Sequence, residues 1–210
     1  MAVTPMFPLQ VAMLPGEELP LRIFEPRYAE LVEACLAADD PAFGVVLIAA
    51  GREVGGGDSR SDVGALARIA ECAEVGTGRY RLRCVMAERF RVLEWLPDNP
   101  YPRAVIDVWD DQPGDPVDFA AVRDIEDRMV DIFERIAQAQ GAQVNARDIV
   151  AGADDSGDPA TWLYTLTARL PMGQADRYAV LAAPTVAERA AALSEAVDTV
   201  AAMVEFQLSE

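Results

Sequence analysis

The chain has 210 residues, of which 51% are apolar, and its net charge is −17 because 35 acidic residues face 18 basic ones. Every basic residue is an arginine, and the sequence contains neither histidine nor lysine. This composition predicts a folded core and excludes Ser–His, Cys–His and Ser–Lys catalytic centres, lysine Schiff bases and lysine-containing phosphate loops. We therefore expect no enzyme and no cofactor, and the acidic charge disfavours nucleic acid and anionic membrane surfaces as partners.

The cysteine content and the length of the apolar runs indicate in which cellular compartment the protein is expected. Cys35, Cys72 and Cys84 are odd in number and far apart in sequence, which is typical of a reduced protein with buried thiols. The longest apolar run, residues 43–50, is shorter than the roughly 20 residues that a bilayer span needs. The segment before Arg22 carries no basic residue, unlike a signal peptide. We expect a cytoplasmic protein.

The first half of the chain alternates short apolar runs with glycine and proline, as strands and turns do. One helix is predicted from Pro26, where the missing N–H of proline costs nothing. Its apolar side is predicted to carry Leu31, Val32, Cys35 and Leu36. Many short strands with one helix indicate a small, partly closed β-barrel. The predicted strands cover residues 19–24, 43–49, 63–71, 79–85, 89–95 and 104–109.

After a polar break at residues 110–114 the apolar period changes from 2 to 3.6 residues. A long helix is predicted with Gly141 ending it. Its apolar stripe consists of Phe119, Val122, Ile125, Met129, Ile132 and Ile136. Further helices are predicted from Pro159 with Asp158 as cap, over residues 174–182, and from a Thr185–Glu188 capping box to the end. The last helix repeats apolar residues at Val186, Ala190, Leu193, Val197, Val200 and Val204, as helices packed on other helices do. The fold class is therefore α+β, with a β-barrel subdomain over 1–112 and a helical subdomain over 113–210.

Two acidic or glycine-rich segments invite a ligand interpretation. Residues 55–58 read Gly-Gly-Gly-Asp, but neither the spacing of a phosphate loop nor a following helix is present, so a turn is favoured. Residues 154–158 faintly resemble a calcium loop but lack its spaced acids and closing glutamate, so a linker is favoured. We expect no metal site.

Alternating arginines mark the strands of residues 79–95. They would form a basic stripe, but Glu71, Glu74, Glu88 and Glu94 lie close in sequence. Cross-strand pairing then predicts a solvated, ion-paired sheet face rather than a nucleic-acid site. The arginines concerned are Arg79, Arg81, Arg83, Arg89 and Arg91. The three cysteines are interpreted as core residues.

A family resemblance is carried by the segment Phe24-Glu25-Pro26-Arg27-Tyr28, which follows Leu14-Pro15-Gly16-Glu17-Glu18. Phe43-Gly44-Val45-Val46, Gly78-Arg79-Tyr80 and Arg89-Phe90-Arg91-Val92 extend the match. These motifs resemble the amino-terminal, substrate-binding domain of the ATP-dependent protease Lon over nearly the whole chain. The chain is similar to free-standing members that lack the ATPase and protease domains.

The resemblance implies a PUA-like, partly closed β-barrel with one packed helix, followed by a C-terminal α-helical bundle. It also implies recognition of polypeptides. In its most specific segment, Phe24 and Tyr28 are expected to anchor the helix on the barrel, while Glu25 and Arg27 are held by backbone groups or by charges such as Glu53. These five residues are the candidate binding residues.

Two functions follow. The first is a non-catalytic module that binds unfolded or partner polypeptides, and a homo-oligomer is compatible with it. The alternative is a small-molecule or nucleotide-binding protein that uses a cleft between barrel and helices.

Overall fold

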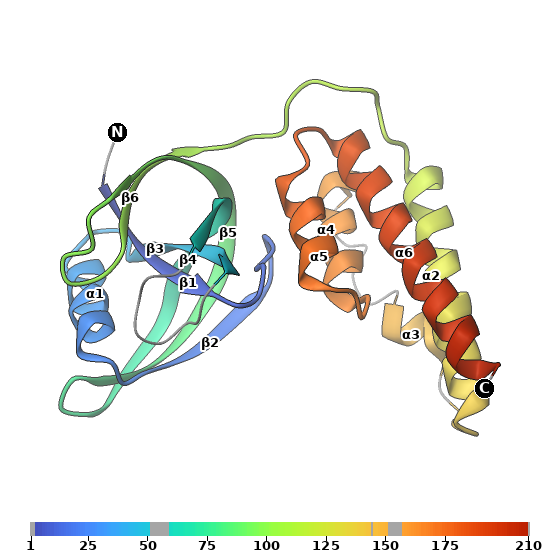
Figure 1. The fold of residues 1–210 in the computed structure, drawn as a ribbon, viewed down its shortest axis with the longest axis horizontal. Coiled ribbons are helices and arrows are strands. Elements are labelled where there is room, and N and C mark those ends of the chain that lie inside the picture. The colour runs from blue at the N-terminus through green and yellow to red at the C-terminus, as the bar shows by residue number, and fades with distance from the viewer. Residues whose placement is uncertain (1–2, 51–58, 144, 151–156, 210) are drawn as a thin grey trace. The chain divides into compact units, whose positions relative to one another are not determined.

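The computed structural model describes residues 3–50, 59–143, 145–150 and 157–209. The chain divides into two compact units, Met1–Asp110 and Asp111–Glu210 (Figure 1). The first unit is built on a β-sheet and the second consists of helices, so the α+β class predicted from the sequence is confirmed.

The sheet of the first unit has the strand order β2-β5-β4-β3-β1-β6 in the described residues, and β5 also pairs with β6. This second pairing brings the sheet back on itself, which gives the partly closed barrel that was expected. β1 and β3 are parallel, and the other pairs are antiparallel. The strands are β1 (Val3–Leu9), β2 (Glu18–Ile23), β3 (Ala42–Ala50), β4 (Ser59–Gly76), β5 (Arg79–Leu96) and β6 (Arg103–Val108).

Two predictions about the strands are wrong. Residues 79–85 and 89–95 belong to one strand, β5, because Met86 stays buried and pairs with Ala67 on β4. A register shift at this pair lets the strand continue through the polar residues that suggested a break. β1 was missed because Pro5 and Pro8 argue against a strand, yet both residues pair with neighbouring strands.

Helix α1 (Pro26–Leu36) begins at Pro26 as predicted. Its apolar side, including Leu31, Val32 and Cys35, packs into a core with strand residues such as Phe43 and Leu82. Leu36, also predicted on this side, is instead exposed at the last position of the helix. A separate cluster around Phe90 fills the other part of the barrel with Met6, Val46 and Ala104. The chain therefore builds its barrel core from the alternating residues of the strands on one side and from α1 on the other.

Phe90 occupies space that two glycines leave open. A Cβ atom added to Gly64 would lie 2.7 Å from Cζ of Phe90 and 2.1 Å from the carbonyl oxygen of Val45, and one added to Gly44 would lie 2.9 Å from Cζ of Phe90. Any side chain at these positions would overlap the core, so both glycines are required by close packing.

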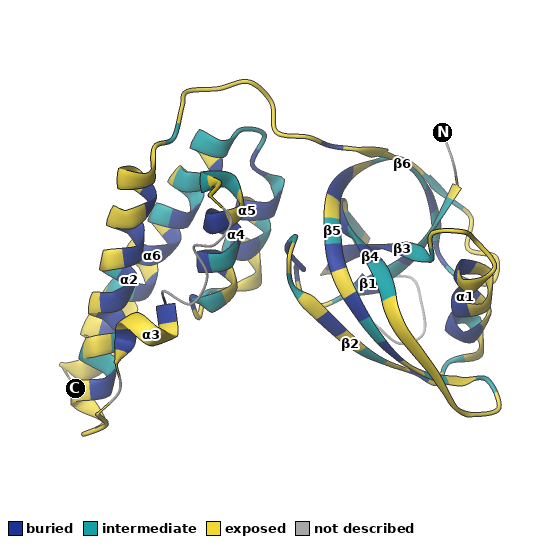
Figure 2. Cartoon of the chain, turned by 180° about the vertical axis from the view of Figure 1, so that it is seen from behind, coloured by how far each residue is buried: buried dark blue, intermediate teal, exposed yellow. Residues whose placement is uncertain are grey.

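The second unit contains α2 (Phe119–Ala139), α3 (Ala146–Val150), α4 (Pro159–Arg169), α5 (Gln174–Ala182) and α6 (Val186–Leu208). α6 contacts α2, α4 and α5. Each long helix turns buried residues inward and exposed residues outward (Figure 2). Leu193, Val197, Val200 and Val204 form the buried side of α6, in agreement with the predicted apolar stripe.

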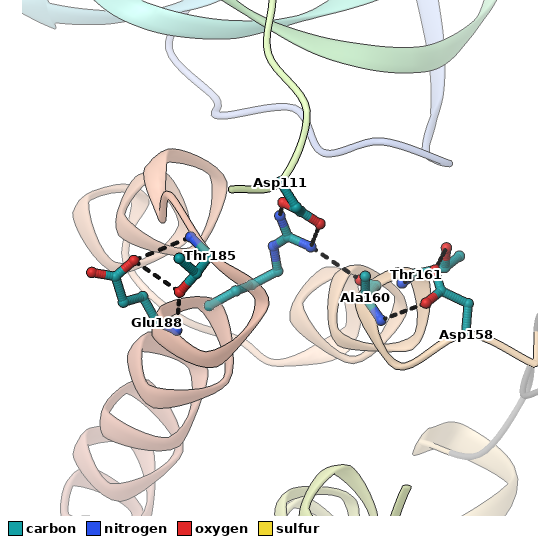
Figure 3. A network of polar contacts seen from close by, with 7 residues as sticks. Asp111, Asp158, Ala160, Thr161, Thr185 and Glu188 are labelled. Carbon is teal, nitrogen blue, oxygen red and sulfur yellow. Dashed lines mark hydrogen bonds and ion pairs between the residues drawn. The ribbon is translucent and has the colours of Figure 1, made fainter. Parts of the chain in front are cut away.

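Local capping signals located the helix ends correctly. The Asp158 carboxylate accepts hydrogen bonds from the backbone N–H groups of Ala160 and Thr161 (Figure 3). Thr185 and Glu188 form the predicted capping box, in which each side chain bonds the backbone N–H of the other (Figure 3). The sequence missed the short α3.

The apolar stripe of α2 was predicted correctly only in part. Val122, Ile125, Met129 and Ile132 are buried, but Phe119 at the first position of the helix is exposed. The helix periodicity alone does not show how far the neighbouring helices extend, so the end of a stripe is easily overestimated.

Candidate functional site

The segment Phe24–Tyr28 joins β2 to α1, and its two aromatic residues point in opposite directions. Tyr28 is 5% exposed, and its ring centroid lies 4.2 Å from that of Phe7. Phe24 is 62% exposed. The expectation that both anchor the helix is therefore wrong for Phe24. Ile23 takes the inward position at the end of β2, so the next residue of the extended chain faces solvent.

Glu25 and Arg27 hold this corner together. The backbone carbonyl of Glu25 accepts hydrogen bonds from the N–H groups of Tyr28 and Ala29, at 3.0 and 3.1 Å, which makes Glu25 the N-cap of α1. Arg27 Nε donates to Glu25 Oε2 at 3.1 Å, and its guanidinium lies 4.5 Å from the Tyr28 ring centroid. Glu53, the fifth predicted residue, lies outside the described residues. Among the described members, only Phe24 offers a large apolar surface to a partner.

A hollow of about 550 Å³ lies on the outer face of β2, β5 and β4. We call it the β2–β5–β4 groove. Exposed residues run along β2 and along the ends of β4 and β5 that form it (Figure 2). The groove was not predictable from the sequence, although the alternation of Arg79, Arg81 and Arg83 correctly placed arginines on the outer face. Its lining residues are Glu18, Pro20, Glu71, Cys72, Ala73, Arg81, Leu82 and Arg83.

One end of the groove contains an ion-pair triad. Arg83 lies between two carboxylates, 2.6 Å from Glu71 and 3.4 Å from Glu18. The hydrogen bond from Arg83, followed by its charge, lowers the pKa of Glu71. This end therefore matches the predicted ion-paired sheet face, and its two glutamates against one arginine leave it a small negative excess.

The other end of the groove, where Arg81 is a lining residue and Arg22 lies beside it, does not match that prediction. Arg22 on β2 lies directly opposite Arg81 on β5, and Ala73 on β4 is the next residue across the sheet. Neither arginine has an acidic partner within the described part of the chain. The predicted ion pairs do not form here because strand register aligns these arginines with each other and with an alanine. Sequence proximity to glutamates does not reveal that alignment.

The remaining arginines of the predicted stripe have another environment. Arg89 and Arg91 lie over the ring of Trp109, with guanidinium carbons 4.3 and 3.4 Å from its centroid. Side chains two residues apart on a strand share a face, which allows both to reach one indole. These arginines have a structural contact on the barrel, and they are not part of the groove.

The cysteines divide into two kinds. Cys35 and Cys84 are buried, and burial raises the pKa of each thiol to about 12. Cys72 is exposed, so the prediction of three buried thiols is wrong for this residue. Beyond Ile69, β4 extends past the α1-covered core, and its side chains there have little to pack against. Cys72 thus belongs to the surface of the groove.

Two smaller hollows lie on the helical unit. One, of about 280 Å³, is lined by Asp115, Asp158 and neighbouring residues, and the other, of about 360 Å³, by Asp176, Glu195 and Asp198 among others. Both have acidic walls. Over the described ranges, no group of three or more cysteine, aspartate or glutamate side chains is arranged to hold a metal ion. Nor is any helix in those ranges both long enough and apolar enough to cross a membrane.

Comparisons with known proteins agree with the barrel-and-helix architecture. The chain is 31% identical over 113 residues to the Lon protease of Anaeromyxobacter dehalogenans. This match covers 53% of the chain and 13% of that protein. A Lon N-terminal domain protein from Xanthomonas campestris is similar in structure, with a TM-score of 0.62, 23% identity and coverage of 89% of this chain and 93% of the other. The N-terminal domain of a Mycobacterium avium complex Lon protease gives a TM-score of 0.65, 14% identity and coverage of 94% and 98%.

The match to a protein family extends over almost all of both units. The family model described as the ATP-dependent protease La (LON) substrate-binding domain covers residues 3–199. This range contains the corner with Phe24, the whole β2–β5–β4 groove and most of α6. The chain therefore belongs to the Lon substrate-binding domain family.

Proposed function

We propose that this chain is a non-catalytic module that binds non-native or partner polypeptides, and that the β2–β5–β4 groove is its contact surface. The observation that carries the proposal is the groove itself, an open hollow on the outer face of the barrel in a member of a substrate-binding domain family. Its mixture of apolar and charged lining suits an extended peptide, which presents both kinds of side chain. The lack of histidine and lysine supports a role without catalysis.

The free edge of β2 is poorly suited to pairing with an added strand, which favours a peptide that binds across the outer face of the sheet. In the β2–β5 ladder, Met86 N–H donates to the Glu17 carbonyl, so every second residue from Glu17 onward bonds towards β5. Pro20 falls among the other residues, whose backbone groups face the free edge, and proline has no N–H to offer there. A strand-adding peptide would lose one ladder bond at Pro20.

Partners of other classes are less well supported. The net charge of −17 opposes binding to nucleic acid and to anionic membranes, and we propose a cytoplasmic setting in which the partner is a protein. A second copy of the chain is one such partner. The alternative, a small-molecule or nucleotide ligand, predicts a rise in thermal unfolding temperature with a metabolite, which a thermal-shift screen would detect.

The test compares aggregation of a client with and without the groove. Reduced insulin serves as the aggregating client, and light scattering measures its protection by the intact chain. Ala73→Tyr fills the groove from an exposed strand position, where an aromatic residue is well tolerated. Ala191→Tyr, on the exposed side of α6, is the matched control. Protection by the unaltered chain and by the control, with loss in Ala73→Tyr, supports the proposal; no protection by the unaltered chain at micromolar concentration contradicts it.

A further inference from the structure

Arg22 and Arg81 form an unusual cross-strand pair. They are opposite each other in an antiparallel ladder, and both are exposed. The alternation set by the Met86–Glu17 hydrogen bond places them in a non-hydrogen-bonded position, where the side chains of the two strands approach most closely. Two positive side chains in this position repel each other, so an anion bound between them would be stabilised on both sides.

Within the described ranges, no acidic side chain is paired with these two arginines. Across the sheet from Arg81 lies Ala73, and the acids of the groove, Glu18 and Glu71, are already paired with Arg83. Among the residues that the structure describes, Arg22 and Arg81 make neither an ion pair nor a side-chain hydrogen bond. In a chain with a net charge of −17, an uncompensated pair of this kind stands out.

The charge continues along the same face. Arg79 precedes Arg81 by two residues on β5, so its side chain leaves the strand on the same side, roughly 7 Å further along. It too has no acidic partner in the described ranges. Phe24, two residues after Arg22, adds an exposed aromatic surface beside this row. The groove thus has one end with a small acidic excess. At its other end Arg81 lines the groove, and the adjoining surface of Arg22, Arg79 and Phe24 makes this end cationic and aromatic.

We propose that the cationic end of the groove binds an extended acidic segment of another polypeptide, with carboxylates at alternate positions and an apolar residue beside them. This inference rests on the proposed polypeptide-binding function and adds the chemistry of the client. Carboxylates two residues apart on an extended chain lie roughly 7 Å apart on one side, which matches the separation of Arg79 and Arg81. One carboxylate between Arg22 and Arg81 accepts hydrogen bonds from two guanidinium groups, and the apolar residue contacts Phe24.

The surrounding charge makes the site selective for short acidic segments. The field of the whole molecule repels long polyanions such as nucleic acids, while the local arginines attract a few carboxylates at close range. Added salt screens the long-range repulsion first, and it weakens the close contacts between arginine and carboxylate only when the Debye length approaches their separation. Binding should therefore weaken at high ionic strength, roughly 1 M.

The experiment measures fluorescence anisotropy with the full chain and labelled peptides of about 12 residues, long enough in extended form to span β2. The main probe has aspartates at alternate positions, one leucine and an amidated C-terminus. A second probe has asparagine for every aspartate, a third has the same composition with consecutive aspartates, and a fourth is neutral with a free C-terminal carboxylate. We expect the main probe to bind about tenfold more tightly than the other three.

Variants connect this preference to the arginines. Arg22→Gln/Arg81→Gln should weaken binding of the main probe by about tenfold, whereas Arg135→Gln, at a half-buried arginine of the helical unit, should leave it within about twofold. Urea midpoints equal to that of the unaltered chain establish that the variants are folded. Equal binding of the aspartate and asparagine probes, tighter binding of the fourth probe, or unchanged binding by the double variant overturns the inference.

The client assay separates this failure from failure of the proposed function. If the chain protects reduced insulin but shows no preference for the acidic probe, polypeptide binding stands and the acidic specificity is refuted. If the chain neither protects insulin nor binds any peptide, both proposals are refuted.

Discussion

The guanidinium of Arg189, on α6, is paired with the carboxylate of Asp111, the first residue of the helical unit (Figure 3). Arg189 is 1% exposed and also lies 4.1 Å from the Tyr164 ring centroid, while Nη1 is 3.2 Å from Asp111 Oδ2. A charge this deeply buried is stable only with its partner. The pair therefore fastens the beginning of the unit to the first turn of its last helix.

Removing the two partners should have unequal effects. Asp111→Ala leaves a buried, uncompensated guanidinium and should lower the free energy of unfolding of the helical unit by about 3 kcal/mol. Arg189→Met leaves a carboxylate that is 30% exposed and can be rehydrated, so a smaller loss is expected. Urea unfolding followed by helical circular dichroism measures both.

The control for this prediction is Asp198→Ala, which removes the exposed partner of Arg128 and should change the free energy by no more than about 0.5 kcal/mol. The double variant Asp111→Ala/Arg189→Met should be more stable than Asp111→Ala alone, because the unpaired buried charge is gone. A double variant less stable than Asp111→Ala would contradict this account.

A second prediction concerns the close packing of Gly64. Gly64→Ala should destabilise the barrel by about 3 kcal/mol, since its Cβ would meet the Val45 carbonyl oxygen, which cannot move without bending β3. Gly76→Ala, on the same strand, is the matched control, because its Cβ would meet only Arg79 Cδ, at 3.8 Å. Chemical denaturation followed by barrel tryptophan fluorescence should show a large loss for the first variant and little for the second. Equal losses would refute the packing argument.

Residues whose role is set by near neighbours were predictable from the sequence. Asp158 and the Thr185–Glu188 box fixed helix starts because a cap needs only residues two or three positions away. The inward direction of Leu82 and Cys84 followed from strand alternation. These features account for the correct fold class.

Residues whose role depends on strand register were not predictable. The opposition of Arg22 and Arg81 arises from pairing between segments about 60 residues apart, and a shift of one position would turn both side chains to the other face. The outward direction of Phe24 has the same origin, because a family motif does not say which of its aromatic residues enters the core. The groove was therefore found only in the structure.

A third prediction concerns thiol reactivity. Because burial raises the pKa of Cys35 and Cys84 to about 12, both stay protonated near neutral pH and should resist a thiol reagent, whereas exposed Cys72 should react. The folded chain should thus bind about one equivalent of label and the urea-unfolded chain about three. Cys72→Ser should abolish labelling of the folded chain; rapid labelling that persists in this variant would contradict the assignment.

The same raised pKa values give the barrel a pH dependence. The unfolded thiols lose their protons from about pH 8.5, while the folded ones keep theirs up to about 12. The contribution of the two buried thiols to the free energy of unfolding is complete below the unfolded pKa. It is lost as pH rises towards the folded pKa. Replacing both buried cysteines by alanine should flatten the decline in stability above about pH 9, and an unchanged decline would assign it to other groups.

The last prediction separates the two aromatic residues of the corner before α1. Tyr28→Ala should lower the free energy of unfolding of the barrel by about 3 kcal/mol, because it removes a buried ring that packs on Phe7. Phe24→Ala removes a ring that is already mostly in water, so stability should change by less than about 0.5 kcal/mol. If Phe24 contacts the bound segment, its loss should instead weaken peptide binding severalfold.

Phe206→Ala is the matched control for Phe24→Ala, since Phe206 is 66% exposed and lies on α6 in the other unit. It makes the same chemical change and should leave both stability and peptide binding unaltered. Urea midpoints and anisotropy titrations on the three variants then separate effects on stability from effects on peptide binding. Weakened binding in Phe24→Ala alone assigns Phe24 to the contact surface, whereas equal weakening in Phe206→Ala would attribute the effect to general apolar adhesion and remove Phe24 from the site.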